Sequence, residues 1–141
     1  MSDPITISSN ELLARFVIRS SWFRQDNTVR PEAFMPRPVP HLDLSTTRRN
    51  GIELHELWEI GRAIAANRLD SEKRAATLYG RADVFAGIFS KNNLAMTIDL
   101  FPKNHVNIIG WPADKSSLMR IAKEIAASAV FVPIPKEYES Q

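Results

Sequence analysis

The stretch LAMTIDLFPKNHVNIIGWPADK, residues 94–115, decides the fold class, because an alternating apolar pattern in it gives way to the start of a helix. Apolar residues at every second position predict a β-strand over 94–101 and another over 105–110. Pro112 then lies near the first helical turn, and Asp114 is a suitable N-cap residue. The stretch therefore predicts two strands followed by a helix.

Two helices are predicted from apolar residues at helical spacing, one around 54–65 and one from about Asp114 to Val130. The apolar stripe of the first helix consists of Leu54, Leu57, Trp58, Gly61, Ile64 and Ala65. The stripe of the second consists of Leu118, Ile121, Ala122, Ile125 and Ala129. Glycine costs about 1 kcal/mol relative to alanine inside a helix, so we expect another backbone to pack closely against Gly61.

The first forty residues predict a helix followed by a proline-rich segment. Apolar residues at helical spacing predict the helix over 9–23. These residues are Leu12, Leu13, Phe16 and Val17. Prolines at positions 31, 36, 38 and 40 forbid a helix over 24–40. We expect a Pro-rich arm there, held on the domain by Phe34 and Met35.

Two further strands are predicted, a short one at 41–45 and a longer one over 78–89. Residues 90–93 have the chemistry of a hairpin turn between the strands over 78–89 and 94–101, since asparagine tolerates a positive φ. Residues 131–141 are expected to form a tail after the last helix, and its polar end, KEYESQ (136–141), is expected to be frayed.

Together these elements predict an α+β fold in a single domain over 1–141. We expect a mainly antiparallel sheet of three to four strands with about three helices packed on one face. The Pro-rich arm precedes an α+β core over 41–130.

The composition is that of an ordinary globular domain, with 141 residues, 44% of them hydrophobic and 24% charged. The absence of cysteine excludes disulfides, thiolate zinc ligands and a cysteine nucleophile. The 18 basic and 16 acidic residues leave a net charge of +2, without the concentrated basic stripe of a duplex-binding domain. Nucleic acid is therefore a candidate partner that the composition does not demand.

The sequence also indicates where the protein works. It starts without the basic residues and apolar run of a signal peptide, and no apolar run approaches about 20 residues, so we expect a cytoplasmic protein that does not enter a membrane. The three histidines stand in unrelated elements without paired ligand spacing, and no glycine-rich phosphate loop occurs. Accordingly, no metal and no cofactor are expected.

His105 and Lys115, at the two ends of the strand-to-helix junction, are the first candidate site residues. His105 is the candidate catalytic residue, because imidazole is the side chain that ordinarily exchanges a proton near neutral pH. Lys115, near a helix N-terminus, could join backbone N–H groups in binding an anion such as phosphate. The alternative is purely structural: a strand histidine bonded to a neighbour, followed by an ordinary turn and N-cap.

Arg48, Arg81 and Asp83 are the other candidate ligand-binding residues. In HLDLSTTRR (41–49), Arg48 follows a strand that places His41, Asp43 and Ser45 on one face, and an arginine there can clamp a carboxylate or phosphate. The alternative is an edge strand with a solvated face. In YGRADV (79–84), Arg81 and Asp83 could orient a ligand, or could form an ion pair across strands worth a few tenths of a kcal/mol.

Four motifs resemble a family of small uncharacterised bacterial proteins. They are LSTTR (44–48), LWEIG (57–61), GRAD (80–83) and NHVNIIGWPADK (104–115), in this order and at this spacing. The similarity extends from about Leu12 to Val130. The resemblance implies a bacterial-type intracellular protein and no particular activity. It favours a role beyond packing for Arg48, Arg81, Asp83, His105 and Lys115.

A second resemblance concerns topology. The predicted helix–strand–strand–strand–helix order over 53–130 is similar to that of the double-stranded-RNA-binding domain, which recognises A-form duplex by shape and phosphate contacts. That domain opens its last helix with clustered lysines. Here ADKSSLMRIAK, residues 113–123, has one lysine followed by two serines, which argues against RNA binding.

Three functions follow as hypotheses. The leading one is a small cytoplasmic binding or interaction module that associates with itself or with a protein partner, as an accessory subunit of a larger bacterial assembly, because no complete catalytic constellation is present. The second is a small enzyme acting on RNA, a nucleotide or another phosphate-bearing substrate, for which Arg48, Arg81, His105 and Lys115 must converge. The third is a toxin–antitoxin or defence-system component.

Overall fold

One antiparallel sheet organises the parts of the chain that the computed structural model describes, residues 7–37, 42–69, 72–99 and 103–139. Its strands are β1 (Leu12–Val17), β2 (Leu44–Arg48), β3 (Gly80–Phe85), β4 (Ala95–Ile98), β5 (His105–Ile109) and β6 (Val130–Pro133). Their order is β4-β5-β2-β1-β3-β6, and every neighbouring pair is antiparallel.

Three α-helices accompany the sheet: α1 (Leu54–Ala66), α2 (Gly87–Lys91) and α3 (Lys115–Ser128). Three short 3-10 helices complete the described elements: η1 (Ser20–Trp22), η2 (Pro31–Phe34) and η3 (Lys136–Tyr138). The α+β class, the antiparallel sheet and the two long helices are confirmed. Within the described residues, no helix is long and apolar enough to cross a membrane.

The sheet has six strands, whereas three to four were predicted, because neither β1 nor β6 was predicted as a strand. The prediction of a helix over 9–23 is wrong, because this segment forms β1 and then η1. β1 lies between β2 and β3 and is covered on both faces, with Leu13 and Val17 on one and Ala14 and Phe16 on the other. A strand buried on both faces is apolar at almost every position, so its spacing matches a helix as well as a strand.

The predicted hairpin around 90–93 is also wrong. β3 ends at Phe85, and the chain then forms the short helix α2 before β4 begins. β3 and β4 are not neighbours, since β5, β2 and β1 lie between them. Asn93 does have a positive φ of 62°, but it adopts this conformation just after a helix instead of in a two-strand turn.

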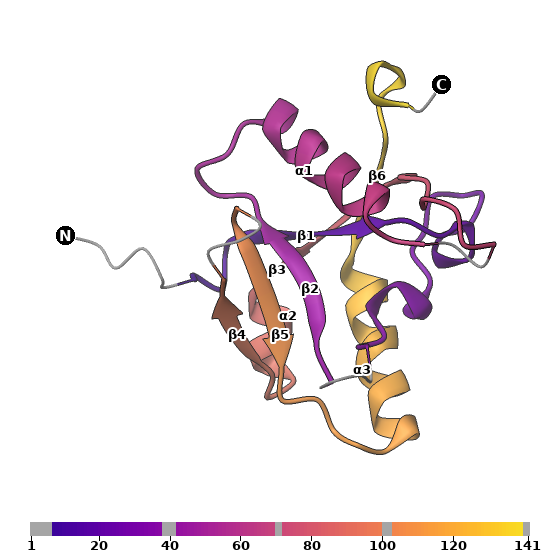
Figure 1. The fold of residues 1–141 in the computed structure, drawn as a ribbon. Helices are drawn as coiled ribbons and strands as arrows, with labels where there is room; N and C mark the ends of the chain where they lie inside the picture. Colours follow the sequence, from indigo (N-terminus) through magenta and orange to yellow (C-terminus); the bar gives the residue numbers. More distant parts are fainter. Residues whose placement is uncertain (1–6, 38–41, 70–71, 100–102, 140–141) are drawn as a thin grey trace.

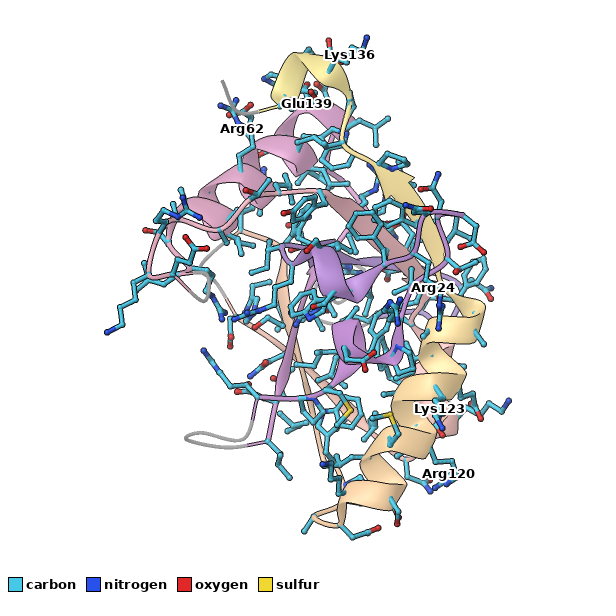
Figure 2. The ribbon with its side chains drawn as sticks, turned by 90° about the vertical axis from the view of Figure 1, so that its right-hand side faces the viewer. Arg24, Arg62, Arg120, Lys123, Lys136 and Glu139 are labelled. Carbon is cyan, nitrogen blue, oxygen red and sulfur yellow. The ribbon has the colours of Figure 1, made fainter. Side chains whose placement is uncertain are left out.

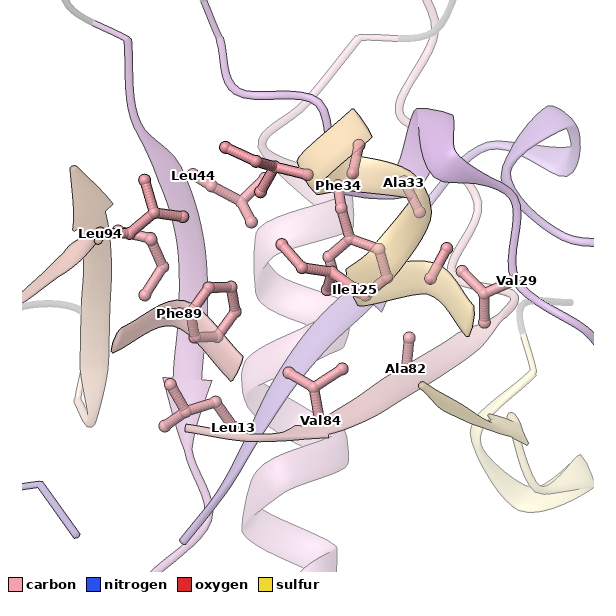
Figure 3. Close-up of a cluster of buried hydrophobic side chains, with 14 of the residues drawn as sticks. Leu13, Val29, Ala33, Phe34, Leu44, Ala82, Val84, Phe89, Leu94 and Ile125 are labelled. Carbon is pink, nitrogen blue, oxygen red and sulfur yellow. The ribbon is translucent and has the colours of Figure 1, made fainter. Parts of the chain in front are cut away.

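Helices cover both faces of the sheet, not one face as predicted. In Figure 1, α1 lies on one side of β1 and α3 on the other. The larger core cluster, on the α3 side, brings Leu13, Val84, Phe89 and Ile125 together, as Figure 3 shows. The smaller core cluster, on the α1 side, is built around Phe16, Leu57, Trp58 and Leu78.

The expected Pro-rich arm over 24–40 is not shown. Its described part, 24–37, contains a turn and η2, and it contributes Ala33 and Phe34 to the larger core cluster, both fully buried. η2 packs against α3. The last part of the arm, and the predicted strand start at His41, lie outside the described residues.

The C-terminal segment is not a frayed tail in its described part. β6 pairs with β3 from Gly80↔Pro133 to Asp83↔Val130, and η3 follows. The ring of Tyr138 stacks on that of Trp58 in α1, with 6.2 Å between the centroids. In Figure 2, Arg62 of α1 and Glu139 are labelled at the same end of the molecule.

Glycine is needed at position 61 because the side chain of Phe16 packs against it, whereas close packing of another backbone was expected. A Cβ at this position would lie 2.6 Å from two ring atoms of Phe16 and 3.2 Å from Leu78. The helix therefore approaches β1 closely because residue 61 has no side chain.

We expect Gly61→Ala to lower the free energy of unfolding by about 1–2 kcal/mol, because the clash with Phe16 exceeds the gain of about 1 kcal/mol in helix propensity. Urea unfolding followed by tryptophan fluorescence measures the change. In a Phe16→Leu background the same substitution should cost much less, since the ring is gone. An equal cost in both backgrounds would contradict this explanation.

Candidate anion-binding site

The site begins where β1 and β2 diverge. β1 pairs with β3 along its whole length, but with β2 only at Leu13↔Arg48 and Ala14↔Thr47. Figure 1 shows β2 running away from β1 at a steep angle. Past the pair Ala14↔Thr47, the edge of β2 that faces β1 has no strand partner. A carbonyl oxygen on this edge therefore needs a hydrogen-bond donor from elsewhere.

Arg15 supplies that donor. Its Nε donates to the carbonyl of Ala33 at 2.8 Å, and its Nη1 donates to the carbonyl of Ser45 at 3.0 Å. The guanidinium also lies over the ring of Trp22, 4.9 Å from the centroid. A guanidinium has five N–H donors, so these two bonds leave about three of them unused. Arg15 thus joins β1, β2 and η2 and still has donors that these two bonds do not use.

A cavity of about 220 Å³ opens beside Arg15. Its charged lining residues are Arg15, Arg19, Arg37, Arg68 and Asp43. Asp43 is already engaged: it lies 3.8 Å from Arg37, and its Oδ2 accepts a bond of 3.3 Å from the Nδ2 of Asn107. Within the described residues, Arg15 and Arg68 have no carboxylate in ion-pair contact, so the cavity has an excess of positive charge.

The pKa values of Arg15 and Arg68 are both lowered, in part by the positive charge of neighbouring arginines. Burial, and after it the positive charges of Arg68 and Arg37, together lower the pKa of Arg15 to about 10. Burial also lowers the pKa of Arg68, with Arg37 adding to the effect and Asp43 opposing it. Both guanidinium groups remain charged at neutral pH. An anion placed between them would relieve their mutual repulsion.

Arg68 and Ser45 connect this cavity to a second one, the α1 slot, of about 420 Å³. The α1 slot is lined by Ser45, Ile60, Ala63, Ile64, Asn67, Arg68 and His105. His105, the candidate catalytic residue, therefore borders it. The Nδ1 of His105 lies 2.8 Å from Asp99 Oδ2, and 14% of its side chain is exposed.

Arg48 lies apart from this site. It forms a two-point ion pair with Glu11, Nε to Oε1 at 2.6 Å and Nη2 to Oε2 at 2.7 Å. Glu11 also accepts a bond from the backbone N–H of Ser8, at 3.0 Å. Arg48 directly follows Thr47, which pairs with His105, so successive side chains of β2 place Arg48 on the face opposite His105. It fastens the segment before β1 to the end of β2.

Arg81 and Asp83 share one face of β3, as predicted, and both are buried there. The carboxylate of Asp83 accepts a hydrogen bond of 3.2 Å from the Nε of Arg81 and one of 2.9 Å from the Nη1 of Arg49. The guanidinium of Arg81 lies 4.8 Å from the centroid of Trp58, and burial is the largest cause that lowers its pKa. This charge network is built into the contact between sheet and α1.

Lys115 is the exposed first residue of α3. The predicted N-cap is confirmed beside it, since Asp114 accepts the backbone N–H of Ser117 at 2.9 Å. Trp111 is buried and donates its Nε1–H to the carbonyl of Ile108 at 2.9 Å. This junction therefore has the structural role considered as an alternative. Neither of the two cavities that His105 borders is lined by Arg48, Arg81 or Lys115.

The central residues of the site, Arg15, Arg68 and Trp22, were not among the sequence candidates. A signal for Arg15 exists: once LLARFV is taken as a buried strand, its one charged side chain falls on the same face as Leu13 and Val17. For Arg68 and Trp22 the sequence has no such signal, since both sit in short connections whose position depends on the fold.

Among the described residues, no group of three or more histidine, aspartate and glutamate side chains is placed to hold a metal ion. Comparison of the chain with protein-family models, with curated proteins and with solved structures gave no match. The resemblance to small bacterial proteins stays a prediction.

The ion pair between Glu11 and Arg48 predicts a pH-dependent stability. The bonds from Arg48 are the largest cause that lowers the pKa of Glu11 from its ordinary 4.5, although burial opposes them. A carboxyl with a lowered folded-state pKa stabilises the fold above its unfolded pKa, and this contribution is lost as the pH falls through the folded value.

We therefore expect Glu11→Gln to lower the free energy of unfolding by about 1–3 kcal/mol at pH 7, and by progressively less below pH 4.5. Urea unfolding of both proteins at a series of pH values measures the difference. Glu59→Gln, which removes the exposed partner of Arg62, is the control and should have little effect at any pH. A pH-independent difference would contradict the assignment.

Proposed function

We propose that this protein is a binding module whose ligand carries an anionic group, a carboxylate or a phosphate, held between Arg15 and Arg68. The observation that carries the proposal is the cavity itself. Four arginines line it, and its one described carboxylate, that of Asp43, is already in contact with Arg37 and Asn107.

The geometry of Arg15 supports binding more than a purely structural role. Its bonds to Ala33 and Ser45 fix the guanidinium plane, and Trp22 supports one face of it. A pre-oriented guanidinium loses little side-chain entropy when it binds an anion, and hydrogen bonds to charged groups contribute about 1.5–3 kcal/mol each. An arginine needed only to bridge two carbonyls has no need of a second arginine nearby.

This proposal keeps the leading sequence hypothesis, a binding module, and specifies the chemistry of its ligand. Association with itself or with a protein partner, the accessory-subunit role, a defence role and a cytoplasmic location remain predictions. Each is compatible with an anion site of this kind.

We expect inorganic phosphate and acetate, each added at constant ionic strength, to shift the Arg15 Nε–H and Trp22 indole resonances in a two-dimensional ¹H–¹⁵N spectrum. Arg68→Gln should weaken the affinity about tenfold to a hundredfold, since it removes one charge-assisted contact. Arg120→Gln is the matched control, because Arg120 is exposed on α3 and does not line the cavity (Figure 2). Equal losses in the two variants, or no shift in the unmodified protein, would overturn the proposal.

A second candidate function, catalysis on a phosphate-bearing substrate, is favoured by the contact between His105 and Asp99. A carboxylate only accepts hydrogen bonds, so the Nδ1 of His105 carries the proton and Nε2 is left as a proton acceptor. Arg68 borders the same α1 slot. In this role His105 takes a proton from water as the water oxygen attacks phosphorus, the bond to the leaving oxygen breaks, and Arg68 stabilises the charge on the phosphoryl oxygens.

If this second function holds, the protein hydrolyses bis(p-nitrophenyl) phosphate, and His105→Ala lowers the rate at least ~100-fold while the fold is retained. Asp99→Asn should lower it less, because it changes only the orientation of the ring. His55→Ala, which removes an exposed histidine of α1, is the control. The absence of turnover in the unmodified protein, or full activity in His105→Ala, would exclude the catalytic role and leave the binding role standing.

A further inference from the structure

The α1 slot arises from a mismatch between helix α1 and the sheet beneath it. Over β1, the sheet presents Ala14 and Phe16, which pack against the helix in the smaller core cluster. Over β2 and β5, the same side of the sheet presents Ser45 and His105 instead. The last turns of α1 therefore extend over polar strand residues that do not fill the space below them.

Aliphatic side chains of α1 line this space. Ile60, Ala63 and Ile64 stand three and four residues apart, which places them on one face of the helix. Ile60 and Ile64 are partly buried at the border of the smaller core cluster. The slot of about 420 Å³ lies inside the range of about 300–1,000 Å³ usual for small-ligand pockets.

The α1 slot and the arginine-lined cavity share lining residues. A small cavity of about 40 Å³ is lined by residues of both larger cavities, among them Arg15, Trp22, Ile64 and Arg68. Arg68 borders all three cavities. A molecule whose charged group contacts Arg68 and Arg15 would therefore extend its remaining atoms along Ile64 toward Ile60.

We propose that the ligand is an amphiphilic organic anion, with one carboxylate or phosphate monoester group at Arg15 and Arg68 and an apolar body in the α1 slot. The inference rests on the proposed function, because it assumes the anion site and adds the class of molecule that occupies it. Charge complementarity selects the head group, and the aliphatic lining selects the body. An anion with a large polar body leaves Ile60 and Ile64 without apolar contact.

The test is a series of linear acids measured against ¹⁵N-labelled protein: acetate, butanoate, hexanoate and octanoate, each below its micelle concentration. Every methylene transferred from water strengthens binding by up to about fourfold, so octanoate should bind at least tenfold more tightly than butanoate. Octanol tests the head group and should bind far more weakly than octanoate. Octyl phosphate against octanoate distinguishes the two head groups, and tight binding of either supports the inference.

Two matched variants locate the body. Ala63→Leu places a larger side chain at a position that borders the α1 slot, and Ala66→Leu makes the same change three residues later on α1, at a position that does not line the slot. Both positions are exposed and border the same further cavity, so the two variants differ in their relation to the α1 slot. Leucine is a good helix former, so both should fold, which circular dichroism verifies. Ala63→Leu should keep the affinity for acetate and lose the advantage of octanoate, whereas Ala66→Leu should change neither.

The outcomes separate this inference from the proposed function. Acetate binding with no gain along the series overturns the amphiphilic ligand and leaves the anion site. Equal binding of octanol and octanoate, or equal losses in Ala63→Leu and Ala66→Leu, also overturns the inference. If neither acetate nor octanoate binds, the proposed function falls with it.

Discussion

The incomplete pairing between β1 and β2 is the constraint on which the rest of the structure depends. β1 uses its full length to pair with β3, but it keeps only two register pairs with β2 before the strands diverge. The carbonyl of Ser45 is then left facing the gap, and the guanidinium of Arg15 donates to it. A polar backbone group at the divergence thus determines where a buried cation sits, and with it where the arginine-lined cavity opens.

The two faces of the sheet are covered in different ways. On the α3 side, fully buried residues such as Phe34 and Ile125 form a continuous apolar layer (Figure 3). On the α1 side, the helix meets apolar residues of β1 and of β6, but a polar or charged surface over β3, β2 and β5. The ion pair of Arg81 with Asp83, over which Trp58 packs, allows α1 to cover part of that surface. Over β2 and β5 it leaves the α1 slot.

The predictions from sequence succeeded where one face of an element is buried. α1, α3 and β5 each have such a face, so their apolar periods of 3.6 or 2 residues indicate the right structure. β1 failed because a strand buried on both sides has no period of 2. β6 failed because its partner, β3, lies about fifty residues earlier in the chain, and nothing local in Val130–Pro133 indicates that pairing.

The site shows the same division. His105 was chosen from its chemistry, and it does border a cavity; Arg48 was chosen on the same grounds, and it is held by Glu11. In the sequence, His105 and Arg48 are equally suitable for contact with a ligand. Their surroundings differ because Glu11 reaches Arg48, and Arg68 borders the same cavity as His105, only after the sheet has formed.

By itself, then, the sequence determined the α+β class, the antiparallel character of the sheet, the two long helices and the N-cap at Asp114. The class, the helices and the N-cap follow from patterns that repeat within a few residues, and the antiparallel character follows from the pairing of successive strands, which β4 and β5 show. Only the tertiary structure decided that Leu12–Val17 is a central strand, that Arg15 lies in the gap beside β2, and that Arg68 joins it there. Contacts between residues distant in the chain settle these features, because burial and unpaired backbone groups arise only when the strands assemble.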